Sequence, residues 1–263
     1  MARTDTLPNF LTDVADAIRE KKGTEETIQA SDFDTEIVNL PSGGGDISEY
    51  FNTTISYNVG TSFHKYQIKK IPSLEIGNNV TSLSELFMSY SNLIEVEGMS
   101  GADNVTNFSN LFNSCSLLEK VNFKNFNTSS AISMANMFAN CQKLSNVNLN
   151  DFNTEKVTDM SFMFSFCTSL VNLDLSSFYT PVLANTNSMF NRCTSLMFLD
   201  IRNMVFDNVT SFRYMFGGFN GQPYVPSDCE IIVKSQTEKD WFTTNFSWLT
   251  NVKTVAEYEA EQG

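Results

Sequence analysis

Val157-Thr158-Asp159-Met160-Ser161-Phe162-Met163-Phe164 leads into Cys167-Thr168-Ser169-Leu170 and then into Leu173-Asp174-Leu175-Ser176-Ser177-Phe178. This stretch decides the fold because its pattern recurs along the chain. At one repeat position an apolar residue precedes a phenylalanine in each of six copies, in the pairs Leu86-Phe87, Leu111-Phe112, Met137-Phe138, Met163-Phe164, Met189-Phe190 and Met215-Phe216. The successive phenylalanines lie 25, 26, 26, 26 and 26 residues apart. A fixed period in this range is the signature of stacked repeats.

Each copy combines a helical start with a strand-like end. Around the Met-Phe pair the apolar residues fall at steps of three and four, as in Val157, Met160 and Met163, which favours a short helix. Six to eleven residues after the phenylalanine the spacing becomes L-x-x-L-x-L, which is typical of a strand. Together they predict an α/β repeat, a leucine-rich-repeat solenoid of about six coils of 25–26 residues over residues 80–220.

Residues 1–41 are predicted to form a small helical module. Residues 7–22 favour an amphipathic helix, and a second short helix is expected from Ser31 to just before Pro41. The apolar face of the first helix consists of Leu7, Leu11, Val14 and Ile18. Because helices this short are marginal alone, we expect them to dock onto a partner and name them the candidate attachment helices.

The remaining boundaries follow from turn and strand signals. Pro41-Ser42-Gly43-Gly44-Gly45 indicates a flexible linker, and residues 42–79 are assigned to that linker and an irregular N-terminal coil. Residues 221–263 are assigned to a C-terminal αβ cap, since an open solenoid end would invite association. Its expected elements are a strand at 228–233, a helix at 238–245 and a closing strand at 252–255.

The charge balance excludes some partners. The formal net charge is −13, so nucleic acid and an anionic membrane surface are improbable partners. No apolar run is long enough to span a bilayer, and Met1-Ala2-Arg3-Thr4-Asp5 does not begin a signal peptide. We therefore expect synthesis in a cytoplasm without secretory export.

No group of residues predicts catalysis, a cofactor or a metal site. His64 is the only histidine, so a Cys-His or Ser-His-Asp site would have to use it, and it lies in an irregular segment. One repeat position holds Cys115, Cys141, Cys167 and Cys193. A row of buried free thiols is favoured there over disulfides or metal, because stacked side chains do not converge on one point.

Aromatic residues at normally polar repeat positions are the candidate ligand or partner contacts. Phe162 and Tyr214 stand two residues before the repeat phenylalanine, where other copies have Glu85, Asn110, Asn136 and Ser188. Phe198 replaces residues such as Asn172, and Tyr179 replaces Asn127 and Asn153. Aromatic side chains are enriched in binding surfaces, although local packing is the alternative explanation at each position.

The quoted motif resembles the BspA-type leucine-rich repeat of bacterial and bacteriophage proteins, over roughly residues 80–220. The resemblance implies a right-handed solenoid with an adhesive or recognition role and no catalysis. Residues 14–23, continued by 28–34, are similar to an N-terminal module of bacteriophage tail or head-fibre proteins.

Under these resemblances the protein is a virion structural protein of the tail, baseplate or fibre. Residues 1–41 would bind other virion proteins within an oligomeric assembly, and the solenoid would recognise a host-surface glycan or protein. The alternative is a bacterial surface adhesion protein with the same repeat, against which the lack of a signal peptide argues.

Overall fold

The computed structural model describes residues 69–71, 74–217 and 223–263. The candidate attachment helices, with Leu7, Leu11, Val14 and Ile18, lie outside the described residues. The same holds for the predicted linker at 41–45 and for His64. The structure therefore bears on the repeats and on the chain that follows them.

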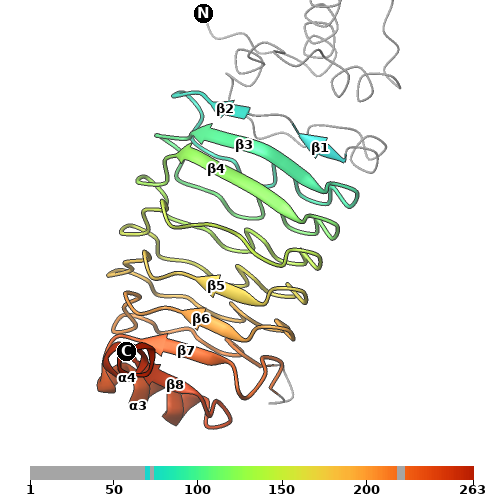
Figure 1. Ribbon diagram of the computed structural model, residues 1–263. Coiled ribbons are helices and arrows are strands. Elements are labelled where there is room, and N and C mark those ends of the chain that lie inside the picture. The colour runs from blue at the N-terminus through green and yellow to red at the C-terminus, as the bar shows by residue number, and fades with distance from the viewer. Residues whose placement is uncertain (1–68, 72–73, 218–222) are drawn as a thin grey trace, which may run out of the picture.

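The described chain forms one stack of coils whose strands lie one above another (Figure 1). The strands are β1 (Lys70–Ile71), β2 (Leu74–Ile76), β3 (Glu95–Gly101), β4 (Lys120–Phe126), β5 (Asn172–Asp174), β6 (Phe198–Asp200), β7 (Glu230–Val233) and β8 (Val252–Thr254). The helices of the described part are α3 (Gln236–Asn245) and α4 (Val255–Gln262). This arrangement confirms the predicted repeat solenoid.

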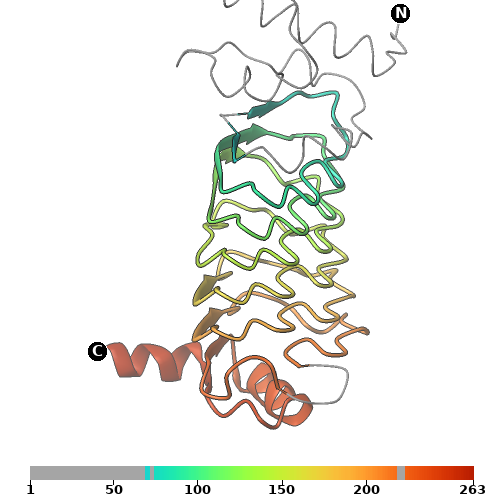
Figure 2. The ribbon, with the colours of Figure 1, turned by 90° about the vertical axis from the view of Figure 1, so that its right-hand side faces the viewer.

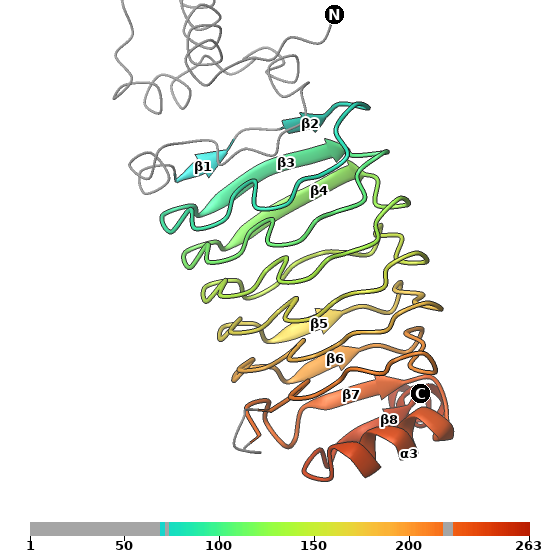
Figure 3. The ribbon, with the colours of Figure 1, turned by 180° about the vertical axis from the view of Figure 1, so that it is seen from behind.

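The strands pair in parallel, and within the repeats each pair joins residues one period apart. Glu95 of β3 pairs with Lys120 of β4, and Asn172 of β5 pairs with Phe198 of β6. β1 and β2 both pair with β3, so they share the place of one strand in the first coil. β7 and β8 continue the second sheet in parallel, and the stack is seen from behind in Figure 3.

The row of strands is interrupted in the third coil, where residues 145–149 form no strand. Val147 and Leu149 are nevertheless buried there, while Asn146 and Asn148 are exposed. The alternation of buried and exposed side chains that a strand requires is thus kept without the ladder of hydrogen bonds.

The repeat phenylalanines form a continuous file through the core. Ring centroids of consecutive members lie 5.4, 5.6, 5.7, 5.9 and 5.3 Å apart from Phe87 to Phe216, and each pair is stacked. Phe112, Phe138, Phe164 and Phe190 have no measurable exposure. Stacked coils therefore place equivalent residues in line, as the 26-residue period predicts.

The predicted helix around each Met-Phe pair is wrong: this stretch is a chain of tight turns. Phe162 and Phe166 have φ angles of 57° and 63°, and the equivalent positions of the other coils are also left-handed wherever the structure describes them. A left-handed residue every four positions prevents a helix. Instead, alternate backbone N–H groups bond to the next coil, as from Phe162 to Asn187 O at 2.8 Å, and others close turns, as from Met163 to Met160 O at 3.2 Å.

Strands occupy one wall of the stack and turns the opposite wall (Figure 2). On the turn side, parallel bridges join equivalent residues of six coils, in the order Ser82, Asn107, Ser133, Asp159, Asn185 and Ser211. At the last coil, α4 projects away from the strand wall (Figure 2).

The C-terminal end of the stack is covered as predicted by a strand, a helix and a further strand, β7, α3 and β8. Phe242 of α3 is fully buried, and its ring lies 5.2 Å from that of Phe206 and 5.9 Å from that of Phe216. Ser235 caps α3 by accepting the N–H of Thr237. The sequence analysis did not predict α4, whose residues are all at least partly exposed.

Candidate recognition surface

The turn wall carries two columns of left-handed residues, four positions apart within each coil. The first column holds Glu85, Asn110, Asn136, Phe162, Ser188 and Tyr214, and the second holds Ser89, Ser114, Asn140, Phe166 and Arg192. Asparagine and serine are common in this conformation because their short polar side chains bond locally. Bulky residues are not, so Phe162, Phe166 and Tyr214 stand out.

We group five residues of this wall as the aromatic strip: Phe162, Phe166, Arg192, Tyr214 and Tyr224. Arg192 contacts Phe166 and Tyr224, and Phe162 and Tyr214 belong to the strip by their place in the first column. The Arg192 guanidinium carbon lies 5.0 Å from the Phe166 ring centroid and 4.2 Å from that of Tyr224. Arg192 Nη2 also donates to the Tyr224 hydroxyl at 3.1 Å. Arg213 lies 5.8 Å from the ring of Tyr214. Arginine held between aromatic rings is the composition of an interaction hot spot.

The strip is locally unfavourable for folding. A bulky residue at positive φ costs on the order of 1 kcal/mol. Phe162 also offers no acceptor to the residue three positions later. In the second coil Asn113 donates to Asn110 Oδ1 at 2.9 Å. In the fourth coil Phe162 takes the place of Asn110, and the buried hydroxyl of Ser165, which takes the place of Asn113, has no hydrogen-bond partner in the described structure. Local strain that folding does not need is a mark of functional positions.

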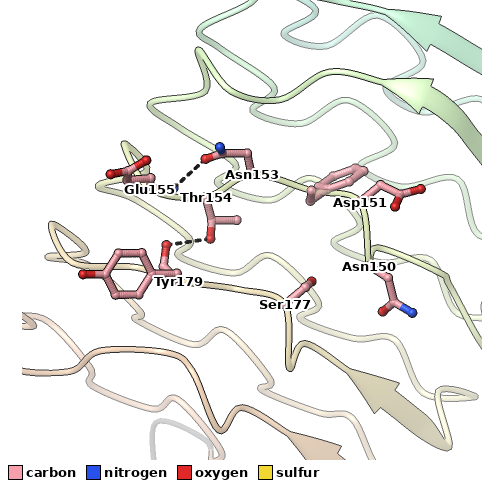
Figure 4. Close-up of a pocket in the computed structure, with 8 residues that line it drawn as sticks. Asn150, Asp151, Asn153, Thr154, Glu155, Ser177 and Tyr179 are labelled. Atoms are coloured by element: carbon pink, nitrogen blue, oxygen red, sulfur yellow. Dashed lines mark hydrogen bonds between the residues drawn. The ribbon is translucent and has the colours of Figure 1, made fainter.

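Tyr179 lies elsewhere, where the chain leaves the strand wall, and the residue is 54% exposed. It lines a hollow of about 250 Å³ formed by two successive coils (Figure 4). The other lining residues are Asn150, Asp151, Phe152, Asn153, Thr154, Glu155 and Ser177. Tyr179 is thus on a different wall from Phe162 and Tyr214, so the structure does not bring all the predicted contact residues together.

Phe198 has an intramolecular partner. It is half-buried on the outer face of β6, and its ring centroid lies 6.0 Å from that of Tyr258 in α4. Arg202 approaches the same tyrosine ring at 5.8 Å and forms an ion pair with Asp200 at 2.6 Å. Local packing against α4 accounts for an aromatic residue at this position.

The four cysteines of the repeat position are buried free thiols. Each thiol donates to the carbonyl of the preceding coil's phenylalanine, as from Cys167 to Phe138 O at 3.1 Å and from Cys193 to Phe164 O at 3.1 Å. Burial raises the pKa of Cys115 and of Cys167 to about 12. A thiol that stays protonated is neither a good nucleophile nor a metal ligand, so this column serves packing.

The strand wall near the first coils is polar and paired. Lys70 Nζ and Lys120 Nζ lie 2.7 and 2.9 Å from the Glu95 carboxylate. Their hydrogen bonds, that from Lys70 first, lower the pKa of Glu95 to about 2. Within the described residues, no cluster of three or more His, Cys, Asp or Glu could hold a metal ion, and no helix has the length and apolarity to cross a membrane.

The sequence analysis missed three members of the aromatic strip: Phe166, Arg192 and Tyr224. Phe166 could have been found, because it replaces Ser114 and Asn140 at one repeat position just as Phe162 replaces Asn110 and Asn136. Tyr224 follows the last repeat, so no comparison among copies reveals it.

Comparison with known proteins addresses the repeat itself. The family model described as "Mycoplasma protein of unknown function, DUF285" matches residues 61–165 and again residues 106–223, which together span more than half of the chain. The chain belongs to the DUF285 family. Membership in DUF285 and the stacked coils fit the BspA-type repeat that the motif resembles. Searches among curated proteins and among solved structures found no match.

Proposed function

We propose that this DUF285 protein is a recognition protein that binds a partner through the aromatic strip of its turn wall. The observation that carries the proposal is the unfavourable conformation of Phe162 and Phe166, at φ angles of 57° and 63°, where the preceding coil has Asn136 and Asn140. Selection for folding alone favours the polar residue there. Tyrosine and arginine are enriched among the few residues that dominate the binding free energy of protein interfaces.

The finer proposal is that the protein is a bacteriophage virion component of the tail, baseplate or fibre. Residues 1–41 would attach it to other virion proteins, and several displayed copies would raise the avidity of the solenoid for a host surface. The similarity of residues 14–34 to a phage module supports this assignment. The alternative, a bacterial surface adhesion protein, is favoured by the bacterial genus in the family description.

The recognition proposal is tested with intact bacterial cells and fluorescently labelled full-length protein. A Phe162→Asn, Phe166→Asn double variant restores the residue type found at Asn136 and Asn140, so it should fold. We expect its cell binding to fall at least about tenfold, the effect of removing one hot-spot contact. The matched control is Asn136→Ser, Asn140→Ser, which should bind like the parent protein. Equal binding by parent and double variant would refute the role of the strip.

The virion assignment is tested by where the protein resides. Electron microscopy of purified particles, with antibody against the solenoid, should place it on the tail, baseplate or fibre, and deletion of residues 1–41 should remove it from the particle. Detection of the protein on the bacterial envelope, with none in particles, would instead support the adhesion alternative.

A further inference from the structure

A second feature of the surface has the make-up of a small ligand site: the hollow at Tyr179. Its volume of about 250 Å³ is below the range of pockets for drug-sized ligands, so it suits a single ring-sized group. Tyr179 and Glu155 lie on one side, and Asn150 and Asp151 on the other (Figure 4). Ser177 lies between them at the edge formed by the next coil (Figure 4).

Two hydrogen bonds between side chains and the backbone fix the side that carries Tyr179 and Glu155. The Thr154 hydroxyl donates to the Tyr179 carbonyl at 2.9 Å, and Asn153 Oδ1 accepts the N–H of Glu155 at 3.0 Å. The side chains of Asn150, Asp151 and Glu155 form no hydrogen bond or ion pair within the described residues. The hollow is therefore an open surface site whose polar groups are free of described side-chain partners.

The chemistry of these groups favours a sugar ring. An exposed tyrosine face stacks on flat apolar C–H surfaces, while its hydroxyl stays in water. Amide groups both donate and accept, and carboxylates accept only, so together they match neighbouring hydroxyl groups that do both. A basic side chain could pair with the two carboxylates and stack on the ring. The amide N–H donors of Asn150 and Asn153 would then face its own N–H donors, which disfavours such a ligand.

The charge of the lining residues restricts the class of sugar. Asp151 and Glu155 contribute two carboxylates, and no lysine or arginine lines the hollow. The chain as a whole has a net charge of −13. Sialic acids, uronic acids and phosphorylated sugars would be repelled, because like charges facing each other disfavour binding.

We infer that the hollow at Tyr179 is a subsite for one neutral pyranose ring of a surface glycan. The inference goes beyond the recognition function proposed above, because the hollow is a second site that does not depend on the aromatic strip. It assigns the ligand to a wall other than that of the aromatic strip. Replacement of Asn127 and Asn153 by Tyr179 in the fourth coil then creates the stacking surface, and the polar coil edges supply the hydrogen bonds.

The test uses the full chain and ligand-observed saturation-transfer NMR, with methyl glycosides of glucose, galactose, mannose and N-acetylglucosamine as probes. At least one should bind the parent protein with millimolar affinity, as a single ring in an open site does. Tyr179→Asn, which restores the residue of the preceding coils, should weaken binding about tenfold, the free energy of one aromatic contact. Tyr179→Phe keeps the ring and should retain binding within about threefold.

The remaining arms separate this inference from the proposed function. The Phe162→Asn, Phe166→Asn variant should bind the sugar normally. The inference is overturned if all four glycosides fail to bind, if Tyr179→Asn binds as well as the parent, or if sialic acid or an oligolysine peptide binds in their place. Loss of sugar binding in the strip variant would also overturn it. Cell binding that depends on the strip would survive any of these results.

Discussion

Asn136 has a φ angle of 57°, a left-handed conformation that few side chains tolerate. Its backbone N–H donates to Ser161 O of the next coil at 2.8 Å, so the conformation is tied to the contact between coils. The same geometry recurs at Asn110 and, four residues later in each coil, at Ser114 and Asn140. The identity of this one side chain therefore affects the free energy of the left-handed turn that joins a coil to the next.

The prediction at residue scale is a contrast between two substitutions of Asn136. Asn136→Ala should lower the free energy of unfolding by about 1 kcal/mol, because an alanine Cβ is disfavoured at positive φ. Asn136→Gly should change it by no more than about 0.5 kcal/mol, because glycine adopts this conformation freely. Urea denaturation of both variants measures the difference. An alanine variant as stable as the glycine variant would show that positive φ is not the constraint.

The column of cysteines makes a prediction at the scale of the repeated element. Burial raises the pKa of the Cys167 thiol from an ordinary value near 9 to about 12. Between these values the unfolded chain has lost the proton that the native state keeps, so the free energy of unfolding falls as pH rises. Each such thiol contributes about 1.4 kcal/mol per pH unit once its unfolded form is ionised.

Cys167→Ser isolates the contribution of one thiol, because a serine hydroxyl can donate to Phe138 O but does not ionise here. The variant should lose stability less steeply than the parent between pH 9 and pH 11, by about 1.4 kcal/mol per pH unit. Urea midpoints and slopes over this range give the comparison. Parallel pH profiles for parent and variant would mean that Cys167 ionises freely in the native state.

The elements differ in how far the sequence predicts them. The strands of the repeats and the two strands of the C-terminal cap follow from apolar alternation, which the structure keeps even in the third coil, where the ladder is missing. The helix predicted at Val157–Phe164 is absent, because apolar steps of three and four fit a chain of turns as well as a helix. The asparagine and serine residues that recur four positions apart were the sequence signal that distinguishes a chain of turns from a helix. The capping box of Thr254 and Glu257, which begins α4, was also present in the sequence.

The candidate site is predictable only in part, because some of its contacts come from segments outside the repeats. Comparison among copies finds Phe162, Tyr179 and Tyr214, because each departs from the residue type that the other copies have at the same position. It cannot show that Tyr224 returns from beyond the last repeat to cover Arg192. It also cannot show that Phe198 packs on Tyr258, since α4 lies outside the period.

A solenoid in which each coil touches only its neighbours should tolerate the loss of one complete coil. Deletion of residues 105–130 removes 26 residues and joins Asn104 to Ala131, which leaves the phenylalanine file and both candidate sites in register. We expect a folded protein with an unchanged far-ultraviolet circular dichroism shape and a smaller urea m-value, because less surface is exposed on unfolding. Binding to cells through the aromatic strip should persist. The matched control deletes residues 105–127, three residues fewer, which puts Phe87 out of line with Phe138 and should unfold or aggregate. Equal behaviour of the two deletions would show that alignment of equivalent residues does not hold the stack together.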